Sequence, residues 1–295
     1  MYDVIVIGGG PAGLQAGLTL GRVHRSALVL DSGAYRNAPT AHLHNFIGQD
    51  GTPPAELRAT ARKEIERYDT VEVREAAAET VRQAGDGFEV DLAGGGTERA
   101  RRLLLATGLR DRLPQIPGLA EVFGDIAAHC PFCHGHEFSG GTVVIAAGPH
   151  AAMLAGTMGR IAGRLVVAGS GHEPVAGVEN LPGDIAEVRR EGDRARVFLT
   201  DGTELVADGL FVSPTLEQAA PFAEQLGLAL LPSGCVEIDP LGRTSLAGVS
   251  AAGDLAHLAA LPMPLAAVLT AASAGLVAAS GLHHDLVMAE AGSLR

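Results

Sequence analysis

The hydrophobic residues of the chain fall into short uninterrupted runs, several of which end at a glycine-rich turn that leads into a helical stretch. The first run, "YDVIVI" at residues 2–7, enters a strand almost at once, and "SALVLD" at 26–31 is the second. Continuous apolar runs of this length are typical of parallel strands that are covered on both faces. Strands that alternate with helices in this way predict an α/β fold with parallel sheets.

The same strand–turn–helix pattern returns in the middle of the chain, at "GGTVVIAAGPHAAMLAGTMGRIAGRLVVAG". We therefore expect two Rossmann-like dinucleotide-binding domains, the second inserted in the first. The first domain is expected to comprise residues 1–114 and 241–295, and the inserted domain residues 115–240. The stretches "GFEVDLAGGGTE" and "ARVFLTDGTELVADGLFV" predict β-hairpins that turn at Gly94–Gly96 and at Asp201-Gly202.

The first glycine-rich turn has the G-x-G-x-x-G spacing of a phosphate-binding loop. It reads Gly8-Gly9-Gly10-Pro11-Ala12-Gly13. The first glycine permits a tight turn, the second lets the backbone approach a pyrophosphate, and the third lets the helix pack on the strand. The N–H groups of the helix N-terminus then face the anion. Asp31 follows Gly13 by eighteen residues, at the end of the next strand, where an acidic side chain receives a ribose hydroxyl.

Composition and charge argue against several classes of protein. The net charge is −12, and no basic block occurs, which argues against nucleic acid as the main partner. Three cysteines are too few for a disulfide scaffold and indicate a reducing compartment. Residues 259–282 carry no charge, but Pro262 and Pro264 interrupt their start and small residues dominate the rest. A buried helix is therefore favoured over a membrane span, and we expect a soluble, cytoplasmic protein.

The stretch "HCPFCHGHEF" at residues 129–138 concentrates the candidate chemistry of the chain. It places Cys130 and Cys133 two residues apart, among His129, His134 and His136. A zinc site and an inert structural thiol pair are two interpretations of this cluster, and thiol–disulfide exchange is the third. A second pair of zinc ligands would normally lie farther along the chain, and the one remaining cysteine, at position 235, has no companion. These ten residues alone do not decide among the three interpretations. The histidines would suit exchange, because histidine titrates near neutrality and can take a proton from a thiol.

Two further motifs indicate a known family. Ala106-Thr107-Gly108 follows a buried strand, and Gly253-Asp254 follows another. Together with the first turn, they resemble the FAD-binding signatures of two-dinucleotide-domain flavoproteins, almost from end to end. A C-x-x-C between the Ala-Thr-Gly motif and the second nucleotide fold resembles the low-molecular-weight thioredoxin reductases. The resemblance implies that the fold is of that type, that FAD is the cofactor and that Asp254 contacts the flavin's ribityl and phosphate region.

The full cysteine string and "YRNAPTAHLHNFIGQDG" at residues 35–51 resemble the dithiol oxidases of the same group. Those enzymes close the disulfide of epidithiodiketopiperazine and dithiolopyrrolone natural products. The resemblance implies that Cys130 and Cys133 form the redox pair, with Cys133 nearer the flavin, and that His129 and Asn37 line the same pocket. His129 is the first choice as the base and His134 the second. His42 and His44 are weaker candidates, expected in a surface loop.

The second glycine-rich turn departs from the NADPH-binding pattern. It reads Ala146-Ala147-Gly148-Pro149-His150-Ala151, so that an alanine replaces the glycine of the tight turn. After the next strand, the family has His-Arg-Arg, where this chain has Ser170-Gly171-His172-Glu173. No arginine pair is therefore available for a 2′-phosphate, and an acidic side chain would repel it. The helix expected from about Leu265 also lacks the family's Arg-Gln-Ala, since the chain reads Ala266-Ala267-Val268 there.

The sequence thus predicts an FAD-dependent enzyme that oxidises a small-molecule dithiol to a cyclic disulfide, in the biosynthesis of a natural product or in self-protection. Dioxygen is the expected acceptor, and the resemblance implies a homodimer. No metal, NADPH, nucleic acid or membrane is expected to take part. Two alternatives remain open: a thioredoxin reductase supplied by another donor such as ferredoxin, and a flavoprotein redox sensor.

Overall fold

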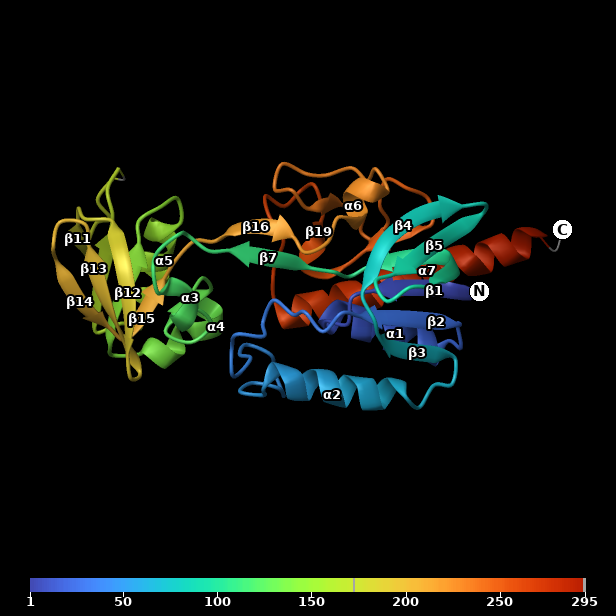
Figure 1. The fold of residues 1–295 in the computed structure, drawn as a ribbon, viewed down its shortest axis with the longest axis horizontal. Helices are drawn as coiled ribbons and strands as arrows, with labels where there is room; N and C mark the ends of the chain where they lie inside the picture. The colour runs from blue at the N-terminus through green and yellow to red at the C-terminus, as the bar shows by residue number, and fades with distance from the viewer. Residues whose placement is uncertain (172, 294–295) are drawn as a thin grey trace. The chain divides into compact units, whose positions relative to one another are not determined.

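The computed structural model describes residues 1–171 and 173–293 and divides the chain into two compact units (Figure 1). Unit 1 comprises residues 1–36, 55–110 and 216–295, and unit 2 comprises residues 37–54 and 111–215. His172, which the sequence places where relatives hold a 2′-phosphate, lies outside the described residues.

The sheet of unit 1 has the order β3-β2-β1-β6-β5-β4, and β18 also pairs with β6. The pairs β3–β2, β2–β1, β1–β6 and β6–β18 are parallel, whereas β4, β5 and β6 pair antiparallel. A further small sheet pairs β17 with β19. The strands of this unit are β1 (Tyr2–Ile7), β2 (Ala27–Asp31), β3 (Val71–Glu75), β4 (Ala78–Ala84), β5 (Gly87–Leu92), β6 (Thr97–Leu105), β17 (Val236–Glu237), β18 (Val249–Ala251) and β19 (Ala256–His257).

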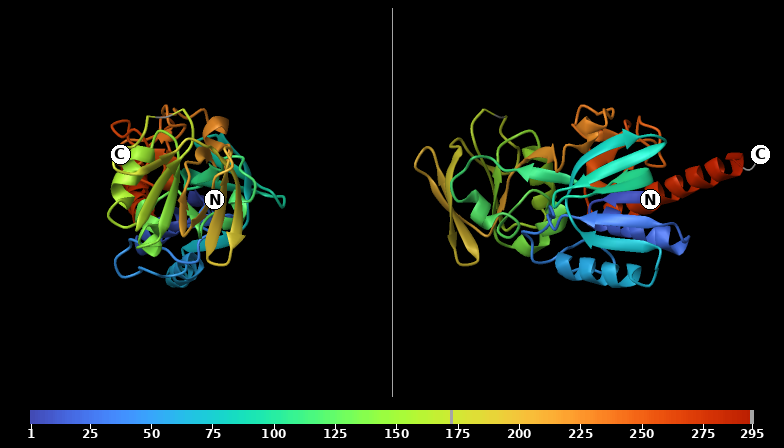
Figure 2. Two further views of the ribbon diagram at one scale, coloured as in Figure 1. Left: turned by 90° about the vertical axis from the view of Figure 1, so that its left-hand side faces the viewer. Right: turned by 45° about the vertical axis from the view of Figure 1, so that its right-hand side comes forward.

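Both faces of this sheet are covered, which explains the uninterrupted apolar runs. Val4 and Val6 pack into one core cluster with residues of helices α1 and α7, while Ile5 and Ile7 pack into a second cluster on the opposite face. Figure 2 shows α7 extending along unit 1 to the C-terminus. The helices of the unit are α1 (Pro11–Arg22), α2 (Pro54–Ile65), α6 (Phe222–Gln225) and α7 (Val268–Ser293), with a 3₁₀ turn η2 (Gly253–Leu255).

Unit 2 contains a parallel sheet of order β11-β10-β9-β15-β8 and an antiparallel sheet of order β12-β13-β14. Its strands are β8 (Ala127–Ala128), β9 (Thr142–Ala146), β10 (Arg164–Ala168), β11 (Glu179–Leu181), β12 (Ile185–Glu191), β13 (Arg194–Leu199), β14 (Glu204–Ala207) and β15 (Gly209–Phe211). Its helices are α3 (Leu119–Val122), α4 (Pro131–His134) and α5 (Ala151–Met158), with a 3₁₀ turn η1 (His136–Phe138).

The expected fold class is confirmed, and so are both hairpins. Asp91 pairs with Thr97 across the first turn, and Phe198 pairs with Glu204 across the second. The two connections between the units, β7 (Leu109–Arg112) and β16 (Thr215–Gln218), pair with each other. The long C-terminal helix begins at Val268, three residues later than expected.

The unit boundaries differ from those expected from the sequence. The chain returns to unit 1 at Leu216 instead of about residue 241, because Phe222, Leu228 and Val236 pack into a core cluster of the unit 1 sheet. Residues 37–54, expected in the first domain, belong to unit 2. Neither boundary coincides with a change in amino-acid composition, so the sequence did not indicate where the chain passes from one unit to the other.

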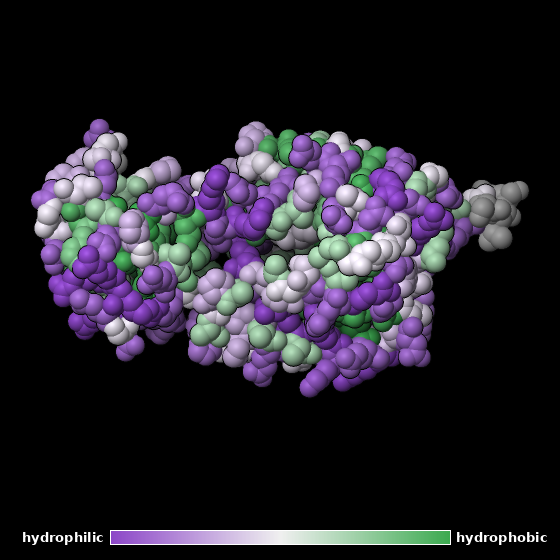
Figure 3. Space-filling view, viewed as in Figure 1, coloured by the Kyte–Doolittle hydropathy of each residue, from purple (hydrophilic) through white to green (hydrophobic). Residues whose placement is uncertain are grey.

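Hydrophobic residues occur in scattered groups among hydrophilic ones on the face shown in Figure 3. Within residues 1–171 and 173–293, no helix has the length and apolar character needed to cross a bilayer.

Candidate active site

The first glycine-rich turn links the end of β1 to the start of α1 and has the geometry of a phosphate cradle. Gly8 has φ +123°, a conformation that favours glycine. A Cβ built on Gly13 would lie 1.8 Å from the carbonyl oxygen of Gly8, so the helix can approach the strand only with glycine there. Gly10 differs, since a Cβ built on it would meet no protein atom within 4 Å. Space is therefore open beside Gly10, where a ligand's phosphates would approach.

The N-terminus of α1 faces this open space without a competing side chain. Pro11 occupies the first turn, no side chain caps the helix, and Ala12 and Gly13 follow. Uncapped N–H groups at a helix N-terminus attract anions. A glycine cradle that leads into such a helix fits a dinucleotide pyrophosphate.

The three motifs of the sequence meet around this cradle within unit 1. A Cβ built on Gly8 would lie 2.2 Å from the carbonyl oxygen of Ala106, and one built on Gly253 would lie 3.0 Å from the Cβ of Ala12. Thr107 and Gly108 follow directly after Ala106, and Gly108 has φ +70°. Segments distant in sequence thus converge on one cradle.

Asp31, at the end of β2, is 2% exposed and is held by three neighbours. Its carboxylate accepts hydrogen bonds from the backbone N–H of Gly33 at 2.9 Å and from the hydroxyl of Tyr35 at 2.7 Å, and it pairs with Arg62. Burial and the bond to Asp31 raise the pKa of Tyr35, so its hydroxyl stays protonated as a donor. Arg62 and Tyr35 were not recognised from the sequence, because α2 carries no motif that marks its arginines.

A cavity of about 300 Å³ opens beside this cluster. It is lined by Asp31, Ser32, Gly33, Tyr35, Arg62, Glu75, Ala76 and Ala77. Its position at the carboxyl ends of β2 and β3 suits the adenosine part of a dinucleotide, because ligands of parallel α/β sheets bind at that edge.

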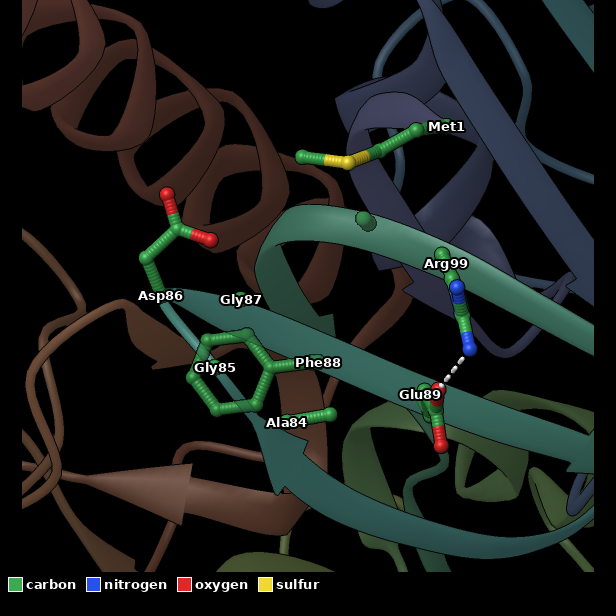
Figure 4. Close-up of a pocket in the computed structure, with 9 residues that line it drawn as sticks. Met1, Ala84, Gly85, Asp86, Gly87, Phe88, Glu89 and Arg99 are labelled. Carbon is green, nitrogen blue, oxygen red and sulfur yellow. Dashed lines mark ion pairs between the residues drawn. The ribbon is translucent and has the colours of Figure 1, made fainter.

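A second cavity, of about 320 Å³, lies at the turn between β4 and β5 (Figure 4). Met1 and Phe88 contribute apolar surface to it, and Glu89 pairs with Arg99 at 2.6 Å. Its lining contains no cysteine, no histidine and no residue of the three motifs. We therefore place the candidate chemistry elsewhere.

Asp254, in η2, pairs with Arg36 at 2.8 Å, and both side chains are largely buried. The backbone oxygen of Asp254 lies 3.8 Å from the sulfur of Cys235, which is a free thiol, 1% exposed. Burial raises the pKa of Cys235, so it remains a protonated thiol at neutral pH. A buried protonated thiol is a poor nucleophile.

Cys130 and Cys133 form a disulfide in unit 2, across the single turn of α4, with their Cα atoms 5.3 Å apart. The backbone explains the spacing. Pro131 starts the helical turn, and the N–H of Cys133 donates to the carbonyl of Cys130 at 3.2 Å. A Cβ built on Gly135 would lie 2.4 Å from the carbonyl oxygen of Pro131, so the turn closes only with glycine there. Both cysteines are half-buried, and Phe132 between them is 71% exposed.

The two candidate bases differ in environment. His129 is exposed, and its ring stacks on Phe123 with the centroids 6.1 Å apart. His134 is half-buried, and its Nε2 lies 3.3 Å from the carbonyl oxygen of Gly124. Its Nδ1 is buried and has no hydrogen-bond partner in the described structure. Burial lowers the pKa of His134, so its imidazole is neutral at pH 7.

The segment 37–54 packs beside α4 within unit 2. Thr40 Oγ1 lies 3.1 Å from His134 Nε2, and His44 lies 3.5 Å from both Asp50 and Glu137. Asn37 begins this segment and is half-buried, while His42 and His136 are exposed. His44 thus lies in a loop, as expected, and contacts Glu137 of η1, which follows the cysteine turn.

The second cradle, between β9 and α5, lacks the glycine geometry of the first. Ala147 contacts Gly169 at the end of β10, and a Cβ built on Gly169 would lie 2.5 Å from the Cβ of Ala147. Asp184 accepts hydrogen bonds from the backbone N–H and the hydroxyl of Ser170, at 2.7 and 3.0 Å, and these bonds lower its pKa. A carboxylate therefore occupies the turn where NADPH-dependent relatives are expected to bind a phosphate.

A zinc site was one of the two other interpretations of the cysteine string. In the disulfide, neither sulfur is a thiolate that could bind zinc. In the part of the chain that the structure describes, no group of three or more His, Cys, Asp or Glu side chains is arranged to hold a metal ion.

Comparison with known proteins agrees with this geometry. The profile of the family described as "Pyridine nucleotide-disulphide oxidoreductase" matches residues 2–172 and 175–275. The chain belongs to this family. It is therefore an oxidoreductase with a Rossmann fold, a flavoprotein that acts in thiol–disulfide chemistry.

Several relatives match the whole length of the chain. The protein named "Thioredoxin reductase tcpT" of Claviceps purpurea is 36% identical over 97% of this chain and 96% of its own length. "Thioredoxin reductase sirT" of Leptosphaeria maculans is 33% identical over 98% and 96%. Among solved structures, that of HlmI superposes with a TM-score of 0.91 at 33% identity, over 99% of this chain and 95% of that one. An oxidoreductase from Agrobacterium tumefaciens gives 0.89 at 36% identity, over 97% and 99%. The chain is thus similar to proteins of the low-molecular-weight thioredoxin reductase type.

Proposed function

We propose that this protein uses FAD to oxidise a small-molecule dithiol to an intramolecular disulfide, with dioxygen as the electron acceptor. The observation that carries the proposal is the Cys130–Cys133 disulfide, held in a partly exposed turn next to a histidine with an unpaired buried ring nitrogen. A role in making a disulfide-containing natural product, or in protecting its producer, would follow from this reaction.

FAD is the cofactor that the cradle residues fit. Gly8, Gly10, Pro11, Ala12 and Gly13 would hold its pyrophosphate, with Ala106, Thr107 and Gly108 beside them. Asp31 would receive the adenosine ribose, and Gly253 and Asp254 would contact the ribityl and phosphate region. When bound, FAD supplies the chemistry that takes two electrons from the reduced cysteine pair and passes them to dioxygen, giving hydrogen peroxide.

Thiol–disulfide exchange assigns a role to each of the two cysteines and to a neighbouring histidine. The substrate attacks Cys130, and Cys133 leaves as a thiolate, the electron-relaying member of the pair in the proposed reaction. Asn37 would line the substrate pocket. We favour His134 over His129 as the base, although the sequence put His129 first. His134 is neutral at pH 7 and keeps a buried nitrogen unpaired, whereas His129 is exposed.

We also propose that NADPH is not a substrate. Ala146 stands in the second cradle where the tight turn requires glycine, and Asp184 places negative charge at the turn after β10. A phosphate brought to that turn would be repelled and would compete with Asp184 for the N–H of Ser170.

The proposed partners are a small dithiol, dioxygen and a second copy of the chain. The homodimer follows from the resemblance to thioredoxin reductases. It is supported by exposed apolar residues along α7, where Leu269, Leu276 and Met288 are 45%, 46% and 58% exposed.

A thioredoxin reductase that receives electrons from a donor other than NADPH is the second candidate. It is favoured by the relatives tcpT and sirT, both of which are named thioredoxin reductases. In that reaction electrons flow from the flavin to a protein disulfide, opposite to the direction proposed above.

Aerobic turnover separates the two functions. We expect the purified protein to consume one dioxygen, and to release one hydrogen peroxide, for each molecule of a small dithiol such as dithiothreitol that is cyclised. Absence of oxygen uptake with every small dithiol, together with reduction of thioredoxin by a reduced ferredoxin, would replace our proposal with the second candidate.

A further inference from the structure

The hydrogen bonds around His134 identify which of its ring nitrogens carries the proton. Nε2 lies 3.1 Å from Thr40 Oγ1 and 3.3 Å from the carbonyl oxygen of Gly124. The hydroxyl of Thr40 donates its single proton to the carbonyl oxygen of His42, at 3.2 Å. Thr40 can therefore only accept from His134, and a carbonyl can only accept as well.

Both neighbours of Nε2 are thus acceptors, so Nε2 bears the hydrogen and Nδ1 carries a lone pair. That Nδ1 is buried and unpaired among the residues that the structure describes. Buried polar atoms without a partner are rare in native structures, and a catalytic role is one of the explanations for them. The histidine nitrogen that stays unprotonated is set by the bond that the other nitrogen makes.

We propose that Thr40 is a positioning residue, which fixes the Nε2–H tautomer of His134 so that Nδ1 accepts the proton of the substrate thiol. The inference rests on the function proposed above and adds a residue that neither the cysteine string nor the cradle motifs indicate. Thr40 acts through His134 and is not itself expected to touch the reacting sulfur atoms.

The packing of the segment 37–54 explains how Thr40 is held. Pro39 lies against Gly124, since a Cβ built on Gly124 would come within 2.5 Å of the Cβ of Pro39. Gly124 has φ +92°, which favours glycine and orients the carbonyl that shares the proton of Nε2. The contact between Pro39 and Gly124 therefore holds both acceptors, Thr40 Oγ1 and the carbonyl oxygen of Gly124, next to Nε2 of His134.

Burial is the main influence on the titration of His134, and it lowers the pKa. The charged or titratable groups that face it from the surrounding elements are Glu137 and Asp125, which raise the pKa, and His44, which lowers it. At pH 7 the imidazole is therefore a neutral acceptor and needs no prior loss of a proton.

The proton transfers balance the exchange reaction. A substrate thiol gives its proton to Nδ1, its sulfur bonds to Cys130, the bond between Cys130 and Cys133 breaks, and the electron pair stays on Cys133. His134 then returns the proton to the Cys133 thiolate. The second substrate thiol gives its proton to Nδ1 and displaces Cys130, which receives that proton in turn. The substrate loses two protons and two electrons, and the cysteine pair gains them.

Replacing Thr40 with valine removes the acceptor and keeps the shape, whereas replacement with serine keeps the acceptor. We expect Thr40→Val to lower kcat/KM for dithiothreitol at pH 7 by about tenfold to a hundredfold, by analogy with the loss of residues that orient metal-binding histidines. The loss should shrink as the pH approaches the pKa of the thiol, because the substrate then ionises unaided. Thr40→Ser should stay within about threefold of wild type across the whole pH profile, since its hydroxyl still accepts from Nε2.

A second readout does not depend on turnover. With ¹⁵N-labelled histidine, the ring nitrogens of His134, assigned with a His134→Gln variant, should report an Nε2–H tautomer in wild type and Thr40→Ser. In Thr40→Val only the carbonyl of Gly124 still accepts from Nε2, so a larger share of the Nδ1–H tautomer is expected.

An unchanged pH profile and tautomer in Thr40→Val would overturn the inference, and so would equal losses in the serine and valine variants. If the valine variant does not fold, Thr40→Ala against Thr40→Ser makes the same comparison. If wild type oxidises no dithiol, the proposed function fails, but the nitrogen shifts still decide whether Thr40 sets the tautomer.

Discussion

Gly8 and Ala106 meet so closely in unit 1 that a Cβ built on Gly8 would lie 2.2 Å from the carbonyl oxygen of Ala106. The glycine-rich turn is thereby held against the Ala-Thr-Gly motif. Because the obstacle is backbone, it cannot be relieved by turning a side chain. The φ of +123° at Gly8 adds strain for any other residue.

We expect Gly8→Ala to lower both the Tm and the amount of flavin that co-purifies. A strained backbone conformation alone is worth about 1–3 kcal/mol, and the contact with Ala106 adds to it. Thermal unfolding and the flavin content per chain would check this. Wild-type Tm and full flavin content in Gly8→Ala would show that the turn adopts another geometry.

Gly10→Ala tests the cradle without that strain. A Cβ at Gly10 meets no protein atom within 4 Å, so the variant should fold with a wild-type Tm in the absence of flavin. It should nevertheless bind FAD at least tenfold more weakly, because the methyl group enters the space proposed for the pyrophosphate. Titration of apoprotein with FAD measures this, and Gly94→Ala, in an exposed turn, is the matched control. Equal affinity in the Gly10 and Gly94 variants would remove the phosphate from this turn.

The cysteine pair should be essential for turnover but dispensable for flavin retention. Cys130 and Cys133 lie in unit 2, whereas the cradle lies in unit 1. Cys130→Ser and Cys133→Ser should each lose more than about 99% of dithiol-dependent oxygen uptake, because a serine hydroxyl forms no disulfide. Oxygen uptake normalised to bound flavin checks this. Substantial turnover in either variant would mean that the dithiol reduces the flavin directly.

The choice of base is tested by comparing two histidines. His134→Ala should lower dithiol turnover at neutral pH by about a hundredfold or more, the usual contribution of a positioned base, with recovery as the pH rises toward the thiol pKa. His129→Ala should have a smaller effect, because His129 is exposed and stacked on Phe123. The reverse ranking would make His129 the base, and wild-type rates in both variants would leave the chemistry to the cysteines alone.

Unit 1 should lose stability in acid through one carboxylate. Glu290 of α7 binds Arg25 at 2.7 Å and Arg101 at 2.6 Å, and these partners lower its pKa from 4.5 to about 2. A carboxylate with a lowered folded-state pKa stabilises the fold fully above its unfolded value and progressively less as the pH falls to the folded one. The difference in Tm between wild type and Glu290→Gln should therefore be largest above pH 4.5 and vanish near pH 2. It should also shrink in high salt, because the Glu290 side chain is 41% exposed and reached by salt. A constant difference across this pH range would show that Glu290 is not held in this way.

The strand, the glycine turn and the helix that form the cradle could be predicted because their signals are local. Gly8, Gly10 and Gly13 lie within one turn, and the strand before them and the helix after them are marked by a simple apolar pattern. The pairing of Cys130 and Cys133 was implied by the family resemblance, and the helical turn that Pro131 and Gly135 define brings the two cysteines together.

The pairings made by long loops could not be predicted. Thr40 and His134 lie 94 positions apart, and Arg62 reaches Asp31 from a helix whose residues follow no motif. The boundary at Leu216 was missed for a similar reason, because the packing of Phe222 and Val236 on the unit 1 sheet depends on the folded core. Such contacts depend on how the folded backbone brings distant segments together, and the residue types alone do not reveal this.

The most direct test of the central claim is the anaerobic reduction of the flavin by each of two reductants. One equivalent of dithiothreitol should bleach the visible flavin absorbance of wild type but not that of Cys130→Ser. The same amount of NADPH should leave the wild-type spectrum unchanged on that time scale. Rapid bleaching by NADPH, with none by the dithiol, would contradict the account and identify an NADPH-dependent reductase.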